Sequence, residues 1–206
     1  MFQDREDAAM QLASRLDAYR GRNPLVLAIP RGAVPMGKTL ARLLEGDFDV
    51  VLVRKLRAPY EAEVAIGSVD ESGWSYVAPY AAEVGAGQDY IAQEKQHQLE
   101  TLRSRRRLYS PVRPPIDPAG RMVIVVDDGL ATGATMIAAL HALRNRGATR
   151  LVCAVPVASP RALEKVRPMA DEVVCLLAPD DFHAVGQYYR RFSQVEDEAV
   201  VELLKN

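Results

Sequence analysis

The order of apolar and amphipathic segments is the feature that most constrains how this chain can fold. Short runs that are apolar throughout alternate with segments whose apolar residues recur at helical spacing. Strands that are apolar on both faces, each followed by a helix, are typical of a parallel sheet covered on both sides. The sequence therefore predicts an α/β, doubly wound, mostly parallel fold. The predicted strands are 24–29, 48–53, 122–126, 151–157 and 173–177, and the predicted helices are 4–20, 34–44, 89–109, 134–146, 158–166 and one that starts near 196.

Two segments interrupt this alternation. Residues 55–88 contain several glycines between short strand signals, and a long insertion of this kind is more often a flexible lid over a binding site than a plain connection. Residues 178–206 concentrate aromatic side chains after the last predicted strand, and we interpret them as a small C-terminal hood. Lid and hood are treated as parts of one domain, residues 1–206.

Composition excludes several classes of protein. The chain is 49% hydrophobic and 26% charged, which is typical of a folded domain and not of a disordered one. Its net charge of −1 gives no electrostatic reason to expect a nucleic-acid binder. No apolar run approaches the roughly 18 residues of a membrane span, and the N-terminus lacks the apolar core of a targeting signal, so we expect a cytoplasmic protein. The two cysteines, Cys153 and Cys175, cannot form a zinc site alone and are expected in the core.

The segment 123–136, VIVVDDGLATGATM, carries the clearest chemical signal. A buried strand brings Asp127 and Asp128 to its carboxyl end, where open α/β sheets bind their ligands. Glycines and threonines follow and lead into a helix, so backbone N–H groups, hydroxyls and the positive end of the helix dipole converge. This pattern predicts a monophosphate cradle, with the two carboxylates facing ribose hydroxyls or Mg²⁺. The alternative is a hydroxyl-rich helix cap with the acids paired to arginines.

Asp-Asp-x-x-x-Thr-Gly-x-Thr after an apolar strand resembles the phosphoribosyl pyrophosphate (PRPP) signature of the type I phosphoribosyltransferases, and the likeness in element order extends over most of the chain. The resemblance implies that Asp127 and Asp128 are catalytic residues that hold the ribose hydroxyls and, weakly or through water, Mg²⁺. We expect a side chain at Gly133 to occupy the phosphate position, so that Gly133→Val weakens binding more than folding. The residues that the resemblance assigns to the 5′-phosphate are Ala131, Thr132, Gly133, Ala134 and Thr135.

Two further segments resemble the pyrophosphate-binding parts of this family. Arg31 and Gly32, in IPRGAVPMG after the first predicted strand, are similar to the pyrophosphate loop, with a comparable Arg-Gly turn in xanthine/guanine members. Arg54 and Lys55, in VRKLRAP after the second strand, are similar to the Arg-Lys pair of adenine phosphoribosyltransferases. Because both pairs leave strands at their carboxyl ends, we expect all of these charges to face one crevice. The alternatives are an ordinary glycine turn and exposed basic residues.

Four residues bear on how the acceptor, the base that would receive the phosphoribosyl group, is bound. Ala131 stands where hypoxanthine/guanine members have an aspartate. Glu61 and Glu63 are candidate general bases, with solvated loop acids as the alternative. Phe182 lies in a stretch similar to the purine-stacking segment of hypoxanthine/guanine enzymes and is the candidate base-binding residue, whereas a core or interface aromatic is the alternative.

The resemblance thus implies a Mg²⁺-dependent phosphoribosyltransferase, a glycosyltransferase of nucleotide and nucleoside metabolism. Such an enzyme transfers phosphoribose from PRPP to a nitrogenous base, for which a purine-like base is one candidate, and releases pyrophosphate. The alternative is a non-catalytic regulator that binds PRPP or a nucleotide, because both kinds of protein share the motif. The expected partners are small-molecule substrates, with no nucleic acid and no membrane, and the family likeness implies a homodimer.

Overall fold

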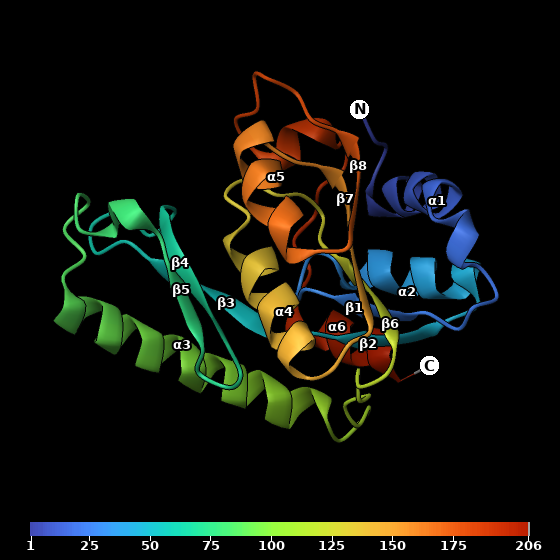
Figure 1. The fold of residues 1–206 in the computed structure, drawn as a ribbon, viewed down its shortest axis with the longest axis horizontal. Helices are drawn as coiled ribbons and strands as arrows, with labels where there is room; N and C mark the ends of the chain where they lie inside the picture. The colour runs from blue at the N-terminus through green and yellow to red at the C-terminus, as the bar shows by residue number, and fades with distance from the viewer. Residues whose placement is uncertain (206) are drawn as a thin grey trace.

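The computed structural model describes residues 1–205, and the last residue of the predicted domain, Asn206, lies outside the described residues. At its centre is a parallel sheet in the order β2-β1-β6-β7-β8 (Figure 1). The register places Ala28, Val126 and Ala154 side by side. The segments that follow β1 and β6 therefore meet at one edge of the sheet. The strands are β1 (Leu25–Ala28), β2 (Asp47–Val50), β6 (Met122–Val126), β7 (Arg150–Val157) and β8 (Glu172–Leu177).

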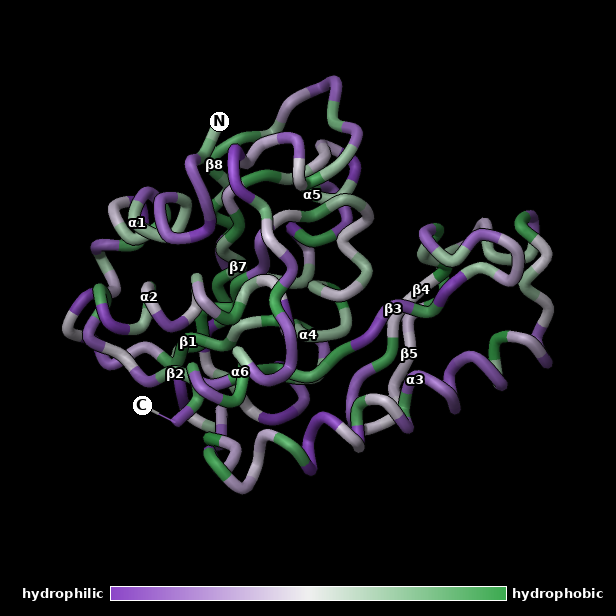
Figure 2. Tube along the Cα trace, turned by 180° about the vertical axis from the view of Figure 1, so that it is seen from behind, coloured by the Kyte–Doolittle hydropathy of each residue, from purple (hydrophilic) through white to green (hydrophobic). Residues whose placement is uncertain are grey.

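Helices cover both faces of this sheet, which confirms the predicted doubly wound fold. Successive side chains of a strand point to opposite faces, so Ile124 and Val126 join the apolar cluster of α1 and α2 while Val123 and Val125 join that of α4 and α5. Figure 2 shows the traces of β1 and β7 as hydrophobic. The helices are α1 (Arg5–Arg15), α2 (Val34–Leu44), α4 (Ala134–Asn145) and α5 (Pro160–Val166).

The segment predicted as a flexible lid is an antiparallel sheet that projects from the core with a long helix across it (Figure 1). The sheet consists of β3 (Val53–Arg57), β4 (Ala65–Asp70) and β5 (Ser75–Val77), and the helix across it is α3 (Gln88–Tyr109), which was predicted as a separate element. The Trp74 ring stacks on His141 of α4, with ring centroids 3.6 Å apart. Ser68 Oγ donates to the carbonyl oxygen of Ala134 at 2.6 Å. The sheet of this segment is therefore docked on α4, and all six residues of β4 are buried.

One predicted strand, 48–53, spans parts of two strands. β2 ends at Val50, and Val53 begins β3 of the projecting sheet. The apolar run FDVVLV continues through this bend because Val51 and Leu52 are themselves buried. Hydrophobicity alone therefore gave no sign of where the chain leaves the central sheet.

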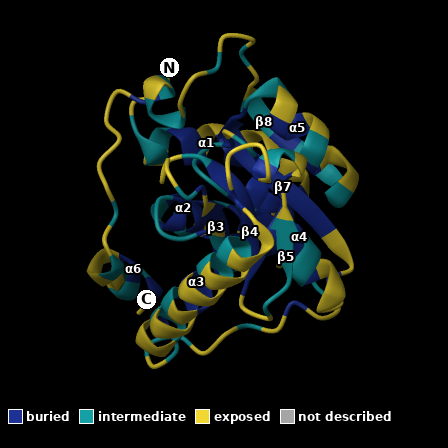
Figure 3. Ribbon diagram, turned by 90° about the vertical axis from the view of Figure 1, so that its left-hand side faces the viewer, coloured by how far each residue is buried: buried dark blue, intermediate teal, exposed yellow. Residues whose placement is uncertain are grey.

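The C-terminal segment lies against the N-terminus. Phe2 N donates to Tyr188 O at 2.8 Å, and Arg190 N donates to Phe2 O at 2.9 Å. From there an exposed, extended stretch, residues 190–196, runs to α6 (Asp197–Leu204) (Figure 3). Short 3-10 helices complete the fold: η1 (Asp17–Tyr19), η2 (Pro79–Ala81), η3 (Arg167–Met169) and η4 (Val185–Tyr188). Within residues 1–205, every helix is too short or too polar to cross a bilayer.

Candidate functional site

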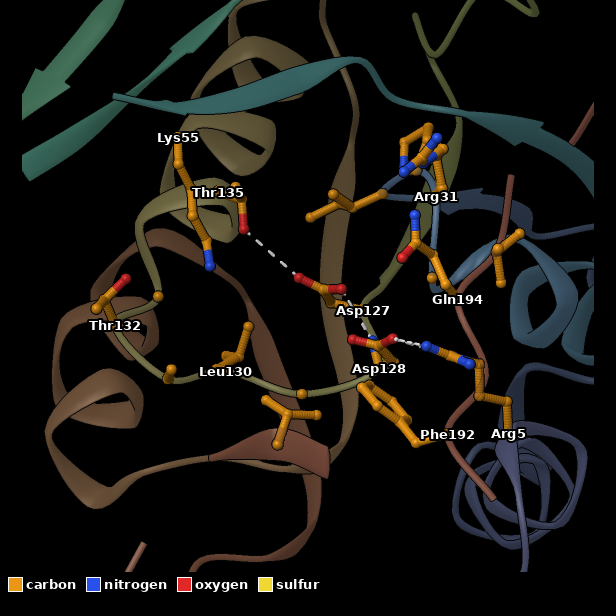
Figure 4. A pocket seen from close by; sticks show the side chains of 18 of the residues that line it. Arg5, Arg31, Lys55, Asp127, Asp128, Leu130, Thr132, Thr135, Phe192 and Gln194 are labelled. Atoms are coloured by element: carbon orange, nitrogen blue, oxygen red, sulfur yellow. Dashed lines mark hydrogen bonds and ion pairs between the residues drawn. The ribbon is translucent and has the colours of Figure 1, made fainter. Parts of the chain in front are cut away.

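A cavity of about 550 Å³ opens at the edge of the central sheet where the loops after β1 and β6 meet (Figure 4). Lys55 of β3 reaches into it from the projecting sheet, and residues 192–195 of the extended stretch form part of its wall. The cavity thus brings together parts of the chain that lie far apart in the sequence. The predicted site residues that line it are Arg31, Gly32, Lys55, Asp127, Asp128, Ala131, Thr132, Gly133 and Thr135.

The two acids at the end of β6 lie side by side in this cavity. Asp127 Oδ1 accepts from the backbone N of Asp128 at 2.9 Å, and its Oδ2 lies 3.5 Å from the donating Oγ1 of Thr135. Burial and the neighbouring Asp128 carboxylate raise the pKa of Asp127 well above its ordinary value. Burial also raises the pKa of Asp128, although the guanidinium of Arg5 opposes this. Two closely spaced, partly buried carboxylates are suited to accept hydroxyl donors or to share a cation.

Arg5, at the start of α1, contacts Asp128 and was not predicted from the sequence. Its Nε and Nη2 donate to Asp128 Oδ2 at 3.0 and 2.9 Å, and its Nη1 donates to Ser193 O at 2.7 Å. The guanidinium carbon lies 4.0 Å from the ring centroid of Phe192. The alternative of acids paired to arginines is thus realised at one oxygen of Asp128, whereas the carboxylate of Asp127 has no arginine ion pair within residues 1–205.

The loop after the acids turns into α4 at Gly133, which has φ +79° and is the N-cap of that helix. Thr132, Gly133 and Thr135 line the cavity, while Ala134 is buried beside it, with its N 3.4 Å from Thr132 Oγ1. The expectation that a Gly133 side chain would occupy the phosphate position is wrong. An added Cβ would instead lie 3.2 Å from Val166 and 3.4 Å from the carbonyl oxygen of Ala162, in the packing of α4 on α5.

Arg31 is held by the C-terminal helix. Its Nη1 donates to Glu196 Oε2 at 2.8 Å and lies 3.5 Å from Asp197 Oδ2. The peptide bond between Pro30 and Arg31 is cis. Arg31 therefore lies at the cavity, but acids from the start of α6 neutralise it.

Arg54 does not line this cavity, contrary to the expectation that all of these charges face one crevice, although it shares an adjoining hollow with Lys55. The two residues belong to β3, and neighbouring residues of a strand point to opposite faces. Arg54 Nε donates to Gln98 Oε1 of α3 at 2.8 Å. Burial and neighbouring arginines, Arg105 foremost, lower the pKa of Arg54 to about 10.

A second, smaller hollow of about 240 Å³ adjoins the cavity and shares Pro30, Lys55 and Thr135 with it. Arg54 lines this hollow, and so do Arg57 and Glu63. Glu61 is exposed on the same turn and lines neither space. The candidate general bases are thus outside the cavity that contains the acid pair.

The aromatic wall of the cavity is Phe192, whereas Phe182 lies outside it. Phe182 stacks on Tyr188 of the hood, with ring centroids 5.7 Å apart. Apolar side chains in the wall also include Ile29, Leu130, Val185 and Val195. Phe192 and Arg5 were not predicted as site residues, because no local sequence pattern connects either of them to the loop after β6.

The acid pair limits how a metal ion could bind. Among residues 1–205, no three His, Cys, Asp or Glu side chains are arranged to hold a metal ion. Mg²⁺ commonly takes only one or two carboxylates and completes its shell with water and substrate phosphates. Asp127 and Asp128 fit a Mg²⁺ ion that arrives with a substrate, but not an all-protein metal site.

The family described as Phosphoribosyl transferase domain matches residues 2–193. This chain belongs to that family. The phosphoribosyltransferase fold is also that of the crystal structure of TT1426 from Thermus thermophilus, with a TM-score of 0.82, 46% identity, and coverage of 99% of this chain and 97% of that one.

Two curated relatives extend the comparison. The Mycobacterium tuberculosis (strain H37Rv) protein named "Putative phosphoribosyl transferase Rv0571c" is 40% identical over 206 residues, which are 99% of this chain and 46% of that protein. The phosphoribosyltransferase domain described here thus spans about half the length of that relative. The uracil phosphoribosyltransferase of Lacticaseibacillus paracasei is 34% identical over 149 residues, 72% of this chain and 62% of that protein.

Proposed function

We propose that this chain binds PRPP and transfers its phosphoribosyl group to a ring nitrogen of a nitrogenous base. In this reaction the bond between C1 of the ribose and the pyrophosphate oxygen breaks, a C–N bond forms, and the base loses its N–H proton. The observation that carries the proposal is one cavity lined both by the acid pair Asp127–Asp128 and by residues 131–133 and Thr135 at the start of α4.

Each end of the substrate has a matching group in this cavity. The backbone N–H groups and hydroxyls of Thr132 and Thr135 lie at the start of α4, where the helix dipole favours an anion such as the 5′-phosphate. The carboxylates of Asp127 and Asp128 accept hydrogen bonds from the ribose hydroxyls. They also oppose the positive charge that develops on the ribose as pyrophosphate leaves.

The pyrophosphate belongs on the side of Arg31 and Lys55. Both line the cavity, and Lys55 also lines the adjoining basic hollow with Arg54. A Mg²⁺ ion held by Asp127 or Asp128 together with substrate oxygens would neutralise part of the leaving group's charge. The base belongs against the apolar wall, of which Phe192 forms part.

A regulator that binds PRPP without catalysis is the second candidate. It is favoured by one observation: Asp127 and Asp128 are the only carboxylates among the residues lining the cavity within residues 1–205, while Glu63 lies in the adjoining hollow. No separate acid is therefore placed to take the proton of the base. Uracil is named for one relative, and we include it with the purines as a candidate acceptor.

Pyrophosphate release from PRPP and Mg²⁺ in the presence of adenine, hypoxanthine, guanine, xanthine or uracil tests the proposal. Turnover with any base that falls by about 10²-fold in Asp128→Asn supports the enzyme. The matched control, Asp181→Asn, changes an exposed acid outside the cavity and should keep full activity. PRPP binding without turnover across the panel supports the regulator, and no PRPP binding at all contradicts both.

A further inference from the structure

Arg5 donates hydrogen bonds to only one of the two carboxylate oxygens of Asp128. Both of its donors, Nε and Nη2, go to Oδ2, at 3.0 and 2.9 Å. No hydrogen bond within residues 1–205 goes to Oδ1, and Figure 4 shows this second oxygen on the side of the cavity where Leu130 and Lys55 lie. The ion pair therefore leaves half of the carboxylate available to a ligand.

Gly32 encloses this oxygen, Oδ2 of Asp128, from a second side. A Cβ added there would come closer than 3.0 Å to Oδ2 and within 3.2 Å of Nη2 of Arg5. The backbone of Asp128 is fixed as well, because Tyr189 Oη donates to its carbonyl oxygen at 2.7 Å. Enclosure of Oδ2 on both sides sets the plane of the carboxylate and the direction of Oδ1.

Arg5 is itself held in place by the C-terminal segment. Its Nη1 donates to Ser193 O at 2.7 Å, and its guanidinium lies over the ring of Phe192 at 4.0 Å. The side chain is only 12% exposed, and Asp128 is 15% exposed. A planar guanidinium, with donors on three separate nitrogens, can satisfy all of these contacts at once, whereas the three donors of an ammonium group share one nitrogen atom.

We infer that Arg5 is a positioning residue that aims Oδ1 of Asp128 at the 2-hydroxyl of the ribose and thereby makes the site select ribosyl over 2-deoxyribosyl ligands. This inference rests on the proposed function, because it assigns Asp128 to the ribose hydroxyls. Arg5 acts through Asp128 and does not itself touch the sugar. A carboxylate free to rotate would lose the fixed hydrogen bond on which such selection depends.

Calorimetric titration with D-ribose 5-phosphate and with 2-deoxy-D-ribose 5-phosphate tests this inference without any turnover. The native chain should bind the ribosyl ligand about tenfold more tightly or better, as expected for a hydrogen bond to a charged acceptor. In Arg5→Met this preference should fall below about threefold, mainly through weaker binding of the ribosyl ligand. Arg5→Lys keeps the charge but not the two-donor grip, and it should also fail to restore the preference.

Arg191→Met is the matched control. Arg191 pairs with Asp4 at 2.6 Å, so it also joins the C-terminal segment to the N-terminal end of α1, but it lies outside the cavity. Its substitution should leave the preference unchanged. Should Arg5→Met fail to fold, Arg5→Lys carries the test.

The outcomes separate this inference from the function on which it depends. Binding of neither sugar phosphate to the native chain would overturn this inference, and the same chain's failure to bind PRPP would overturn the proposed function with it. Equal binding of both would leave a phosphate site but remove the role given to Asp128. A native preference that persists in Arg5→Met, or that Arg5→Lys restores in full, would overturn the positioning role alone.

Discussion

The backbone of Gly32 lies directly against the carboxylate of Asp128. A Cβ added at this glycine would come closer than 3.0 Å to Oδ2 and lie 3.1 Å from Cγ of Asp128. The loop after β1 and the end of β6 are therefore in contact through a position that has no room for any side chain. From the sequence, the loop after β1 is predicted to bind the pyrophosphate of PRPP and the end of β6 to bind its ribose. The contact therefore joins the predicted sites for two parts of one substrate.

Gly32→Ala should displace either the carboxylate or the loop after β1. We expect PRPP to bind at least about tenfold more weakly, because a displacement of about 1 Å is costly in a preorganised site. Gly87→Ala is the control, since nothing lies within 4 Å of its added Cβ. Titration of both variants with PRPP checks the prediction, and native affinity in Gly32→Ala would contradict the close contact.

Gly133→Ala should harm folding. A left-handed backbone costs a non-glycine residue about 1–2 kcal/mol, and the added Cβ would crowd Val166 and Ala162. Gly120→Ala has a similar φ of +72° with nothing within 4 Å, so it reports the backbone cost alone. Urea unfolding should show a larger loss of the free energy of unfolding in Gly133→Ala, by about 1 kcal/mol. Equal losses would show that α5 makes room for the methyl group.

Trp74→Ala should loosen the projecting sheet from α4. The stacking of Trp74 on His141 is an aromatic contact between the projecting sheet and α4. Loss of this contact should lower the free energy of unfolding by about 2 kcal/mol. Hydrogen exchange of peptides from β4 and β5 should become faster. Tyr60→Ala removes an aromatic that is 89% exposed on the same segment and should change neither quantity. Unchanged exchange in Trp74→Ala would mean that other contacts hold the sheet in place.

Glu196→Gln should free Arg31 for a bound anion. The carboxylate of Glu196 accepts from Arg31 at 2.8 Å and competes with any pyrophosphate for it. Exposed pairs contribute about 0.2–1 kcal/mol, so pyrophosphate should bind up to about fivefold more tightly. The difference should shrink at high salt. Glu198→Gln, at an exposed residue of the same helix, should have little effect, and weaker binding in Glu196→Gln would contradict the competition.

The fold and the central part of the site follow from local patterns. The predicted strand at 122–126 and helix at 34–44 coincide with β6 and α2, because a continuous apolar run and a clear helical period leave few alternatives. Asp127 and Asp128 directly follow β6, so any parallel sheet places them at its carboxyl edge. The acid pair was therefore predictable before any three-dimensional information.

Other parts depend on geometry that local patterns do not contain. Whether Arg54 or Lys55 faces the cavity depends on the residue at which β3 begins, and FDVVLV hides that point within one apolar run. The pairing of Arg5 with Asp128 joins residues 123 positions apart. Phe192 lines the cavity, whereas Phe182, the candidate base-binding residue, stacks on Tyr188 outside it. The positions of Arg5 and Phe192 arise only when the N-terminal and C-terminal segments pack together.

The pairing of Phe2 with the hood and of Arg5 with Asp128 has a practical consequence for how this protein is handled. Removing the first five residues, or fusing a bulky tag directly to them, would alter the chemistry of a pocket whose signature motif lies more than a hundred residues downstream. Such a version would disturb or remove the contact on which the inferred preference for ribosyl ligands depends. Tags placed after α6, on the opposite end of the chain, spare this contact.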